Sequence, residues 1–331
     1  MSRRLLDSYG RVGDDLRISV TDRCNFRCVY CMPAEGLQWL PREDILRFEE
    51  IERLARLMVG RYGVKTIRLT GGEPLVRAHL EVLVGMLNDI DPDLDLTMTT
   101  NGMGLRQKAR ALREAGLKRI NISLDTLRPE RFQAIARREA FDRVWDGIEA
   151  AQEVGLDPIK INVVVLRDVN DDEAPDFARL ARERGFEVRF IEFMPLDGDQ
   201  IWTRDRVVPG RVLKERIEQR YPLLARPRGR PGASTDFVFA DGAAGAVGFI
   251  SSVSQAFCTT CNRLRLSAEG GLRTCLFSHR ETPLRELLRG GASDDEVCQV
   301  IETAIWRKEE GHLINEVGFV RPEKSMSQIG G

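Results

Sequence analysis

Three cysteines, Cys24, Cys28 and Cys31, lie in one short stretch with the spacing C-x3-C-x2-C. Thiolate sulfur is a soft ligand that favours zinc or iron–sulfur clusters, and this spacing brings three thiolates close enough to share one centre. A closed zinc site needs a fourth ligand, and none of the three histidines lies nearby in sequence. On a four-iron cluster, three cysteines leave one iron open. The alternatives are a disulfide-forming pair with a spare thiol, or a zinc site completed from elsewhere.

A second set of three cysteines, Cys258, Cys261 and Cys275, has the spacing C-x2-C-x13-C and again no certain fourth ligand. C-x2-C is common in zinc sites, so a zinc ribbon is the alternative to a second cluster. Cys298 lies in an apolar, helix-like stretch, 297–305, where a cysteine behaves as a small buried hydrophobe rather than as a ligand.

The elements that position these cysteines follow an alternating pattern of strands and helices. Strands are expected at 16–20, 64–70, 94–99, 119–124, 160–166 and 188–193, and helices at 42–59, 78–88, 105–115, 129–136, 141–154 and 172–184. This order predicts parallel βαβ units and an α/β fold. We interpret it as a partial (β/α)6 TIM-type barrel over 1–197; periodicity alone also allows an open doubly wound sheet. Residues 198–331 are expected to form a C-terminal region that carries the second cluster, with an exposed connection at 222–245.

Polar motifs follow five of the six predicted strands. They are the first cysteine stretch, Gly71-Gly72-Glu73, Thr99-Thr100-Asn101, Ser123-Leu124-Asp125 and Glu192-Phe193-Met194-Pro195. Because the carboxyl ends of parallel strands meet at one edge of a barrel or sheet, these motifs are expected to share one active face.

The overall charge is balanced, with 50 basic against 51 acidic residues and a net charge of −1. This balance argues against binding to nucleic acid or to a membrane surface. No run reaches the roughly 18 apolar residues that a membrane span needs. The metal-like grouping of the cysteines is typical of a reducing compartment, so a cytoplasmic protein is expected.

Three cations, Arg17, Arg68 and Lys160, lie on predicted barrel strands. A buried cation without an anion is costly, so each requires an anionic partner. That partner is either a carboxylate of the chain, such as Glu73, Asp125 or Glu192, or an anionic substrate. Farther along the chain, Arg263 and Arg265 are spaced to share one face of a strand beside the second cysteine set, and Arg189 is a weaker candidate.

The first cysteine stretch resembles the radical S-adenosylmethionine (SAM) signature C-x3-C-x-aromatic-C, with Tyr30 as the aromatic residue. The resemblance implies a [4Fe-4S] cluster whose open iron binds SAM, and cleavage of SAM to methionine and a 5′-deoxyadenosyl radical that abstracts hydrogen from the substrate. Beside this signature, Gly71-Gly72-Glu73-Pro74 resembles the glycine-rich SAM motif of the same superfamily. The implied SAM contacts are Tyr30, Gly72, Ser123 and Met194.

The second cysteine set, the adjoining Arg263-Leu264-Arg265 and the terminal Ile329-Gly330-Gly331 resemble the GTP 3′,8-cyclase family. This resemblance covers nearly the whole chain and implies two [4Fe-4S] clusters, the second of which offers its open iron to the guanine ring of GTP. The implied GTP contacts are Arg17, Arg68, Thr99, Lys160, Arg263, Leu264 and Arg265. Family members often carry a further basic residue where this chain has Thr66, so a phosphate contact expected there is in question.

The family resemblance also implies a reaction. The radical removes the ribose 3′ hydrogen of GTP, C3′ attacks guanine C8, and (8S)-3′,8-cyclo-7,8-dihydro-GTP forms in the first step of molybdenum cofactor biosynthesis. Arg265 is the candidate catalytic residue that quenches the radical, and the Gly330-Gly331 tail is expected to enter the active site. Cyclic pyranopterin monophosphate synthase is the expected downstream enzyme and a reductant protein the expected electron source, and the sequence is compatible with a homodimer.

Two other functions are compatible with parts of this pattern. A peptide-modifying radical SAM enzyme would also carry an auxiliary cluster, but would not need the cations expected to bind a triphosphate. A zinc-containing nucleic-acid-binding protein would use its cysteines structurally and would need a broad basic face, which the balanced charge disfavours.

Overall fold

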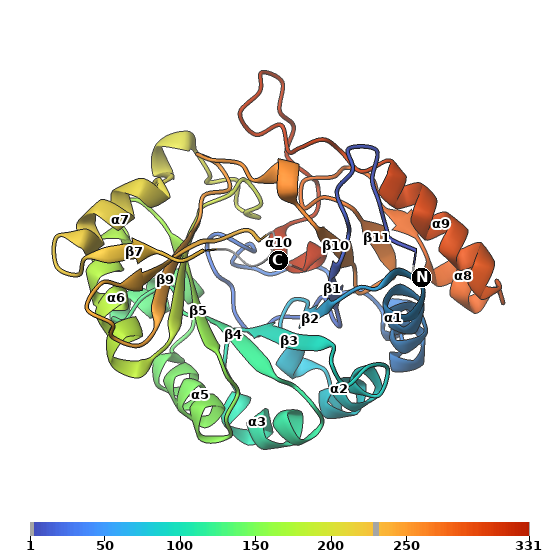
Figure 1. Cartoon of the computed structure of the whole chain (residues 1–331), viewed down its shortest axis with the longest axis horizontal. Helices are drawn as coiled ribbons and strands as arrows, with labels where there is room; N and C mark the ends of the chain where they lie inside the picture. Colours follow the sequence, from blue (N-terminus) through green and yellow to red (C-terminus); the bar gives the residue numbers. More distant parts are fainter. Residues whose placement is uncertain (1–2, 228–231, 331) are drawn as a thin grey trace.

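The predicted strands assemble into a curved sheet of twelve strands with the order β12-β11-β10-β1-β2-β3-β4-β5-β6-β9-β8-β7 (Figure 1). The protein is described by a computed structural model that covers residues 3–227 and 232–330. Neighbours from β10 through β1 to β6 and β9 are parallel, and the outer strands are antiparallel. The strand bounds are β1 (Asp15–Ser19), β2 (Thr66–Thr70), β3 (Asp95–Thr100), β4 (Arg119–Ser123), β5 (Ile159–Val165), β6 (Glu187–Glu192), β7 (Leu223–Ala225), β8 (Thr235–Phe239), β9 (Ala246–Ile250), β10 (Arg263–Leu266), β11 (Gly271–Arg273) and β12 (Thr282–Pro283). Since β12 and β7 end the order without pairing to each other, the barrel is partial, as predicted.

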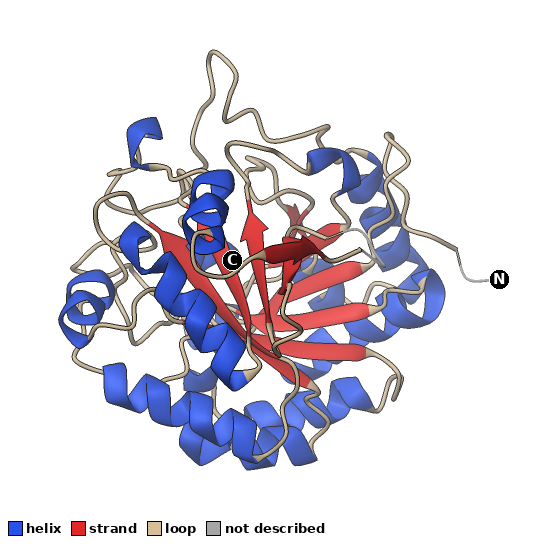
Figure 2. Cartoon of the chain, turned by 60° about the vertical axis from the view of Figure 1, so that its left-hand side comes forward, coloured by secondary structure: helices blue, strands red, loops and turns tan. Residues whose placement is uncertain are grey.

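Helices cover the outer face of this sheet, while the short C-terminal helix α10 lies inside its curve (Figures 1 and 2). The α-helices are α1 (Phe48–Tyr62), α2 (Leu80–Asn88), α3 (Leu105–Glu114), α4 (Pro129–Ala136), α5 (Phe141–Glu153), α6 (Ala174–Arg184), α7 (Gly210–Glu218), α8 (Arg285–Arg289), α9 (Asp294–Trp306) and α10 (Met326–Ile329). Short 3-10 turns lie at Arg42–Asp44, Pro74–Val76, Asp171–Glu173, Arg204–Arg206 and Cys258–Thr260.

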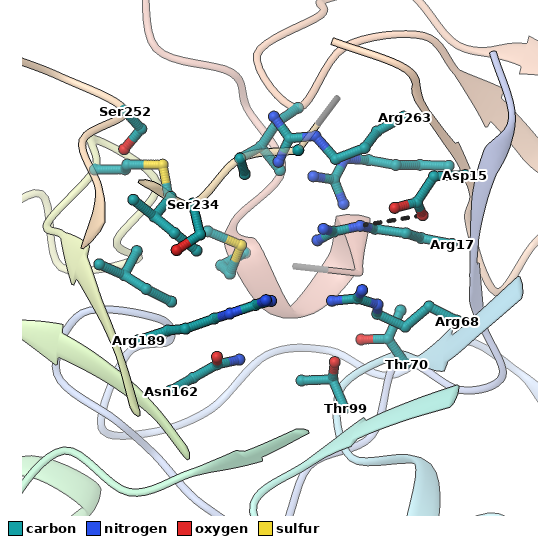
Figure 3. A pocket seen from close by; sticks show the side chains of 18 of the residues that line it. Asp15, Arg17, Arg68, Thr70, Thr99, Asn162, Arg189, Ser234, Ser252 and Arg263 are labelled. Carbon is teal, nitrogen blue, oxygen red and sulfur yellow. Dashed lines mark ion pairs between the residues drawn. The ribbon is translucent and has the colours of Figure 1, made fainter. Parts of the chain in front are cut away.

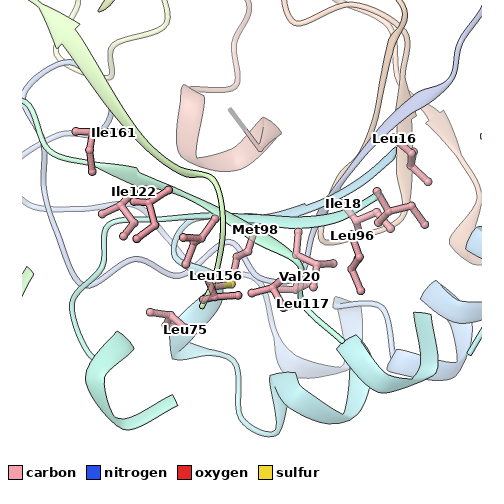
Figure 4. Close-up of a cluster of buried hydrophobic side chains, with 14 of the residues drawn as sticks. Leu16, Ile18, Val20, Leu75, Leu96, Met98, Leu117, Ile122, Leu156 and Ile161 are labelled. Carbon is pink, nitrogen blue, oxygen red and sulfur yellow. The ribbon is translucent and has the colours of Figure 1, made fainter. Parts of the chain in front are cut away.

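The core lies between the sheet and the outer helices (Figure 4). Alternate residues of each central strand are buried and pack there; Leu16 and Ile18 on β1 and Leu96 and Met98 on β3 are at most 1% exposed. Because successive strand residues point to opposite faces, the residues between them point into the barrel. One face of every strand therefore stabilises the fold, and the other is available for a site.

Two local predictions are corrected by the structure. The helix expected at 42–59 begins only at Phe48, because the Glu50 carboxylate accepts the Arg47 main-chain N–H at 2.7 Å and caps the helix there. The connection expected at 222–245 is exposed over 224–227 and 240–242, as predicted, but it also contains two strands that the prediction did not include. There β7 and β8 pair antiparallel, and the rings of Phe237 and Phe239 pack against Phe249 and Tyr221.

The sheet continues across the expected boundary at residue 197. The C-terminal region contributes β9, which pairs with β6, and β10, which pairs with β1, so it extends both edges of the parallel sheet. Both regions, 1–197 and 198–331, thus contribute strands to one sheet. Their division into two domains stays a prediction. Within the described ranges, no helix is long and apolar enough to cross a membrane.

Candidate active site inside the barrel

One cavity of about 730 Å³ lies within the curve of the sheet and is lined by both sets of three cysteines. The cysteines following β1 lie at the carboxyl end of the parallel strands. Cys258 and Cys261 directly precede β10, which is parallel to β1, so they lie at the opposite end. Cys275 follows the antiparallel β11 and therefore lies with them. The two sets thus lie at opposite ends of one cavity, and all seven cysteines of the chain are free thiols.

The first cysteine set forms a tight loop. The Cys31 amide donates to the Cys28 carbonyl at 2.9 Å, and the Phe26 amide donates to the Cys24 sulfur at 3.4 Å. Burial first, and then the nearby Glu73 carboxylate, raises the pKa of Cys24 to about 11, and burial raises the pKa of Cys31 to about 12. Buried thiols of this kind become thiolates only beside a compensating positive centre, such as a metal cluster. The donor set fits iron–sulfur ligation.

Gly71 and Gly72 hold this loop from behind. The Gly72 amide donates to the Thr21 carbonyl at 2.8 Å, and an added Cβ at Gly72 would lie 2.3 Å from the Arg23 carbonyl oxygen. The glycines are therefore required by close packing against the chain before Cys24. The predicted approach of these glycines to SAM stays a prediction.

The two carboxylates nearest the first cysteine set bind neutral groups. Glu73 accepts from the Thr100 hydroxyl and the Asn101 amide, both at 2.6 Å. Asp125 accepts from the Tyr30 hydroxyl at 2.7 Å and so ties the cysteine loop to the end of β4. Burial raises the pKa of Glu73 to about 7 and that of Asp125 to about 6. Neither carboxylate forms an ion pair with the strand cations in the described residues.

The second cysteine set has a different electrostatic setting. Burial favours the thiol of Cys261, but the charges of Arg263 and Lys308 outweigh it and lower the pKa to about 6. Burial raises the pKa of Cys275. In the described ranges, no three His, Cys, Asp or Glu side chains are grouped closely enough to hold a single metal ion. In a cluster each thiolate binds a different iron atom, so its ligands are spread around a larger group.

Between the two sets, arginines from neighbouring strands converge on the cavity (Figure 3). Arg17 on β1 is the register partner of both Arg265 on β10 and Arg68 on β2, so three guanidinium groups stand in a row. Like charges directly opposite each other destabilise a sheet. The nearest anion is Asp15, whose carboxylate lies 4.0 Å from Arg17. Burial, followed by repulsion between the arginines, lowers the pKa of Arg17, Arg68 and Arg265 to about 9.

This arrangement is a buried and positively charged site. In the described part of the chain, Arg68 and Arg265 form no ion pair with a carboxylate, and the Nε atoms of Arg17 and Arg68 have no hydrogen-bond partner. Guanidinium groups bind phosphate oxygens in a bidentate manner. The row is therefore suited to a polyanionic ligand.

Lys160 lines the same cavity and pairs with Glu187. Glu187 also lies 3.7 Å from Arg189 and 3.0 Å from Arg226. The interpretation that the strand cations pair with Glu73, Asp125 or Glu192 is thus wrong for Lys160, because its partner is Glu187. Glu192 instead accepts main-chain amides, including that of Val253 at 2.8 Å.

Sequence comparison identifies the family. Two family profiles match the chain, Radical SAM superfamily over residues 18–181 and Molybdenum Cofactor Synthesis C over residues 186–314. The GTP 3′,8-cyclase of Rhodopirellula baltica is 49% identical over 331 residues, which cover 99% of this chain and 92% of that protein. The GTP 3′,8-cyclase of Paenarthrobacter nicotinovorans is 45% identical over 343 residues, 99% of this chain and 97% of that protein. The chain belongs to the GTP 3′,8-cyclase family.

The fold is shared more widely than the family. Streptococcus suis SuiB bound to S-adenosylmethionine superposes with a TM-score of 0.60 at 15% identity, over 97% of this chain and 77% of that one. The same protein bound to its precursor peptide SuiA gives a TM-score of 0.62 at 15% identity, over 96% and 76%. These likenesses support the partial-barrel fold alone, while the superfamily and the cyclase family are identified by the profiles and the sequence relatives.

Most site residues expected from the cyclase family line the cavity. Those that do are Arg17, Cys24, Cys28, Tyr30, Cys31, Arg68, Gly72, Thr99, Ser123, Lys160, Met194, Cys258, Cys261, Arg263, Arg265 and Cys275. Leu264 does not, because its side chain alternates to the other face of β10 and is fully buried in the core. A contact between Leu264 and a ligand could come only from its main chain. Thr66 lines the cavity and its hydroxyl donates to Asp95 at 3.3 Å, so it adds no positive charge.

The C-terminal segment of this cyclase-family chain also reaches the cavity. Met326 and Ser327 of α10 line it, and Ile329 is fully buried. The Arg265 guanidinium donates to the Gly330 carbonyl at 2.6 Å. The expectation that the tail enters the active site is thus met as far as Gly330, while Gly331 lies outside the described residues.

Several lining residues were not among the predicted ones. Asn162, Ser234, Ser252 and Asp15 all face the cavity (Figure 3). Asn162 could have been found, because it follows Lys160 by two positions on the same strand face. Ser234 and Ser252 flank strands β8 and β9, and no local pattern places those strands against the barrel.

Proposed function

We propose that the protein converts GTP to (8S)-3′,8-cyclo-7,8-dihydro-GTP in a SAM-dependent reaction, the first step of molybdenum cofactor biosynthesis. The observation that carries the proposal is the row of Arg265, Arg17 and Arg68 between two three-cysteine sets at opposite ends of one cavity. A nucleoside triphosphate is an anion that this row can bind. The 45–49% identity to GTP 3′,8-cyclases supports GTP as that nucleotide.

Two iron–sulfur clusters, one on each cysteine set, would supply the electron that cleaves SAM and an open iron for the guanine ring. Gly72, Ser123 and Met194 line the end of the cavity nearer the first set and would hold SAM. The arginine row and Lys160 would bind the triphosphate, and Thr99 would contact the substrate. Arg265 would act beside the reacting nucleotide, because it lines the cavity and its guanidinium holds the tail at Gly330.

The test is an anaerobic assay of cluster-reconstituted protein with SAM, a reductant and either GTP or ATP. With GTP, we expect 5′-deoxyadenosine from SAM and a cyclised nucleotide from GTP. With ATP, we expect no cyclised nucleotide. Mass spectrometry follows 5′-deoxyadenosine and the nucleotide product. Replacing Cys258 by Ser should abolish cyclisation. If SAM is cleaved while GTP is untouched, the cyclase proposal fails, and a peptide-modifying radical SAM function becomes the better reading.

The wider setting is part of the same proposal. The product would pass to cyclic pyranopterin monophosphate synthase, a separate protein would donate electrons, and the enzyme would work in the cytoplasm, where thiols stay reduced. A coupled assay with the synthase should yield cyclic pyranopterin monophosphate. Size-exclusion chromatography with light scattering would distinguish a homodimer from a monomer.

A further inference from the structure

Lys308 lines the cavity beside the second cysteine set and is only 5% exposed. Its ammonium donates to the main-chain carbonyls of Cys261 and Arg263, each at 3.0 Å, and lies 4.0 Å from the Cys261 sulfur. Two of its three N–H donors are thus used by carbonyls, and the third is free for the sulfur. No carboxylate within the described ranges lies within ion-pair distance of this ammonium.

A buried lysine without a carboxylate is expensive unless another anion offsets its charge. Here the group near the ammonium that can carry a negative charge is the Cys261 sulfur of the predicted cluster site, at 4.0 Å. A thiolate is an anion, and a thiolate cluster becomes more negative when it is reduced. A fixed positive charge at this position therefore stabilises the reduced cluster more than the oxidised one.

Arg11 provides a contrast on the same loop. Its guanidinium donates to the Cys258 carbonyl at 2.8 Å, so it also holds the cysteine loop in place. However, its Nε lies 2.6 Å from the Asp7 carboxylate, which offsets its charge. Arg11 is therefore a structural clamp, whereas the charge of Lys308 is left for the sulfur.

We propose that Lys308 is a positioning residue for the second iron–sulfur cluster: its ammonium raises the midpoint potential of that cluster and ties the cysteine loop to the strand that carries Arg263 and Arg265. The proposal rests on the proposed function, which places a cluster on Cys258, Cys261 and Cys275. Through the bond to the Arg263 carbonyl, the same side chain fixes the cluster relative to the substrate arginines.

The experiment compares the reconstituted full-length protein with Lys308→Gln, Lys308→Arg and the control Lys118→Gln. Glutamine keeps two N–H donors for the two carbonyls but removes the charge. Lys118, which directly precedes β4, also donates to a main-chain carbonyl, that of Pro92 at 2.5 Å, but does not line the cavity. The readouts are iron content and redox titration followed by electron paramagnetic resonance. The first cluster is recognised by the change in its signal when SAM is added.

We expect Lys308→Gln to shift the potential of the second cluster to more negative values and to leave the first cluster unchanged. Lys308→Arg should largely restore the wild-type potential, and Lys118→Gln should change neither cluster. If Lys308→Gln loses the second cluster while Lys308→Arg retains it, the need for the charge is supported.

An unshifted potential in Lys308→Gln overturns the inference while leaving the proposed function intact. Loss of the second cluster from both Lys308 variants also overturns the role of the charge, because the shape of lysine would then be what matters. Wild-type protein that binds iron only at the first cysteine set would instead refute the proposed function itself.

Discussion

Arg17, Arg68 and Arg265 stand in register on three neighbouring strands, an arrangement that opposes folding. Burial removes water from their charges, and each guanidinium repels the next. Asp15 offsets only part of this charge, because one carboxylate faces four arginines of the cavity. Burial raises the pKa of Asp15, but the charges of these arginines outweigh burial and lower it. This cost is offset when an anionic ligand binds between the guanidinium groups.

Replacing Arg68 by Met tests whether the arginine row binds the anionic ligand. We expect GTP to bind roughly 10- to 100-fold more weakly, because a hydrogen bond to a charged group contributes about 1.5–3 kcal/mol. The Tm should not fall, since the substitution removes a repelled charge and fills similar space. Equilibrium dialysis under anaerobic conditions and thermal melting give the two values. Arg53→Met, which breaks a surface pair with Asp294, is the control and should leave GTP affinity unchanged.

Lys160 predicts a pH dependence of binding. Burial, followed by repulsion from Arg189, lowers the pKa of Lys160 to about 8, although Glu187 opposes the shift. A bound triphosphate favours the charged ammonium, so GTP affinity should fall as the pH rises from 7 through 8 to 8.5. Titration calorimetry at these pH values measures the slope. Lys160→Met should bind more weakly and show a flatter slope; an equally steep slope in that variant would exclude Lys160 as its source.

The turn after β2 packs so closely against the chain before Cys24 that we expect a packing defect in Gly72→Ala. The new Cβ would lie 2.3–2.4 Å from the carbonyl oxygens of Arg23 and Asp22, so the loop that leads to Cys24 must move. Overpacking of this kind costs about 1–3 kcal/mol. We expect a lower Tm and less iron on the first cysteine set.

The matched control for this substitution is Gly85→Ala. Gly85 lies inside α2, where an added Cβ meets nothing within 4 Å, and alanine favours a helix by about 0.5–1 kcal/mol. Its Tm should stay the same or rise, with full iron content. If Gly72→Ala behaves like Gly85→Ala, the tight packing between the glycine turn and the cysteine loop is not required.

The central strands could be predicted from sequence because their alternation is local. Ile67 and Leu69 face the helices while Thr66, Arg68 and Thr70 line the cavity, and this period of two is visible in the letters alone. The same rule places the Leu264 side chain away from the cavity. The position of β10 could not be predicted, because its pairing with β1 joins segments from the two ends of the chain.

In the whole molecule, the pairing of β10 with β1 decides how far apart the two cysteine sets lie. Once β10 lies parallel beside β1, Cys258 and Cys261 must lie at the end of the barrel opposite to Cys24. The sequence motifs indicated two three-cysteine sets, but nothing local indicates opposite ends. The same holds for Lys308, whose sequence neighbourhood contains no ligand motif.

The C-terminal tail lies inside the barrel, against the row of arginines. Gly330 has φ +67°, and an added Cβ would lie 2.2 Å from the Ser19 hydroxyl oxygen. Gly330→Ala should therefore displace the tail and move the main-chain carbonyl of residue 330 away from Arg265. Because Gly330 contacts Arg265 and not the cysteines, we expect loss of cyclised product with continued cleavage of SAM and unchanged iron content.

Gly318→Ala separates backbone strain from this local clash. Gly318 has a similar left-handed φ of +88°, but an added Cβ there meets nothing within 4 Å. Both substitutions cost about 1–2 kcal/mol of backbone strain, so the contacts with Ser19 and Thr70, which an added Cβ makes only at Gly330, separate the two variants. Mass spectrometry of the nucleotide product compares the two variants. Equal product from both would show that the tail beside Arg265 does not take part in cyclisation, whereas loss confined to Gly330→Ala would make the last residues of the chain part of a site whose other components begin at Asp15.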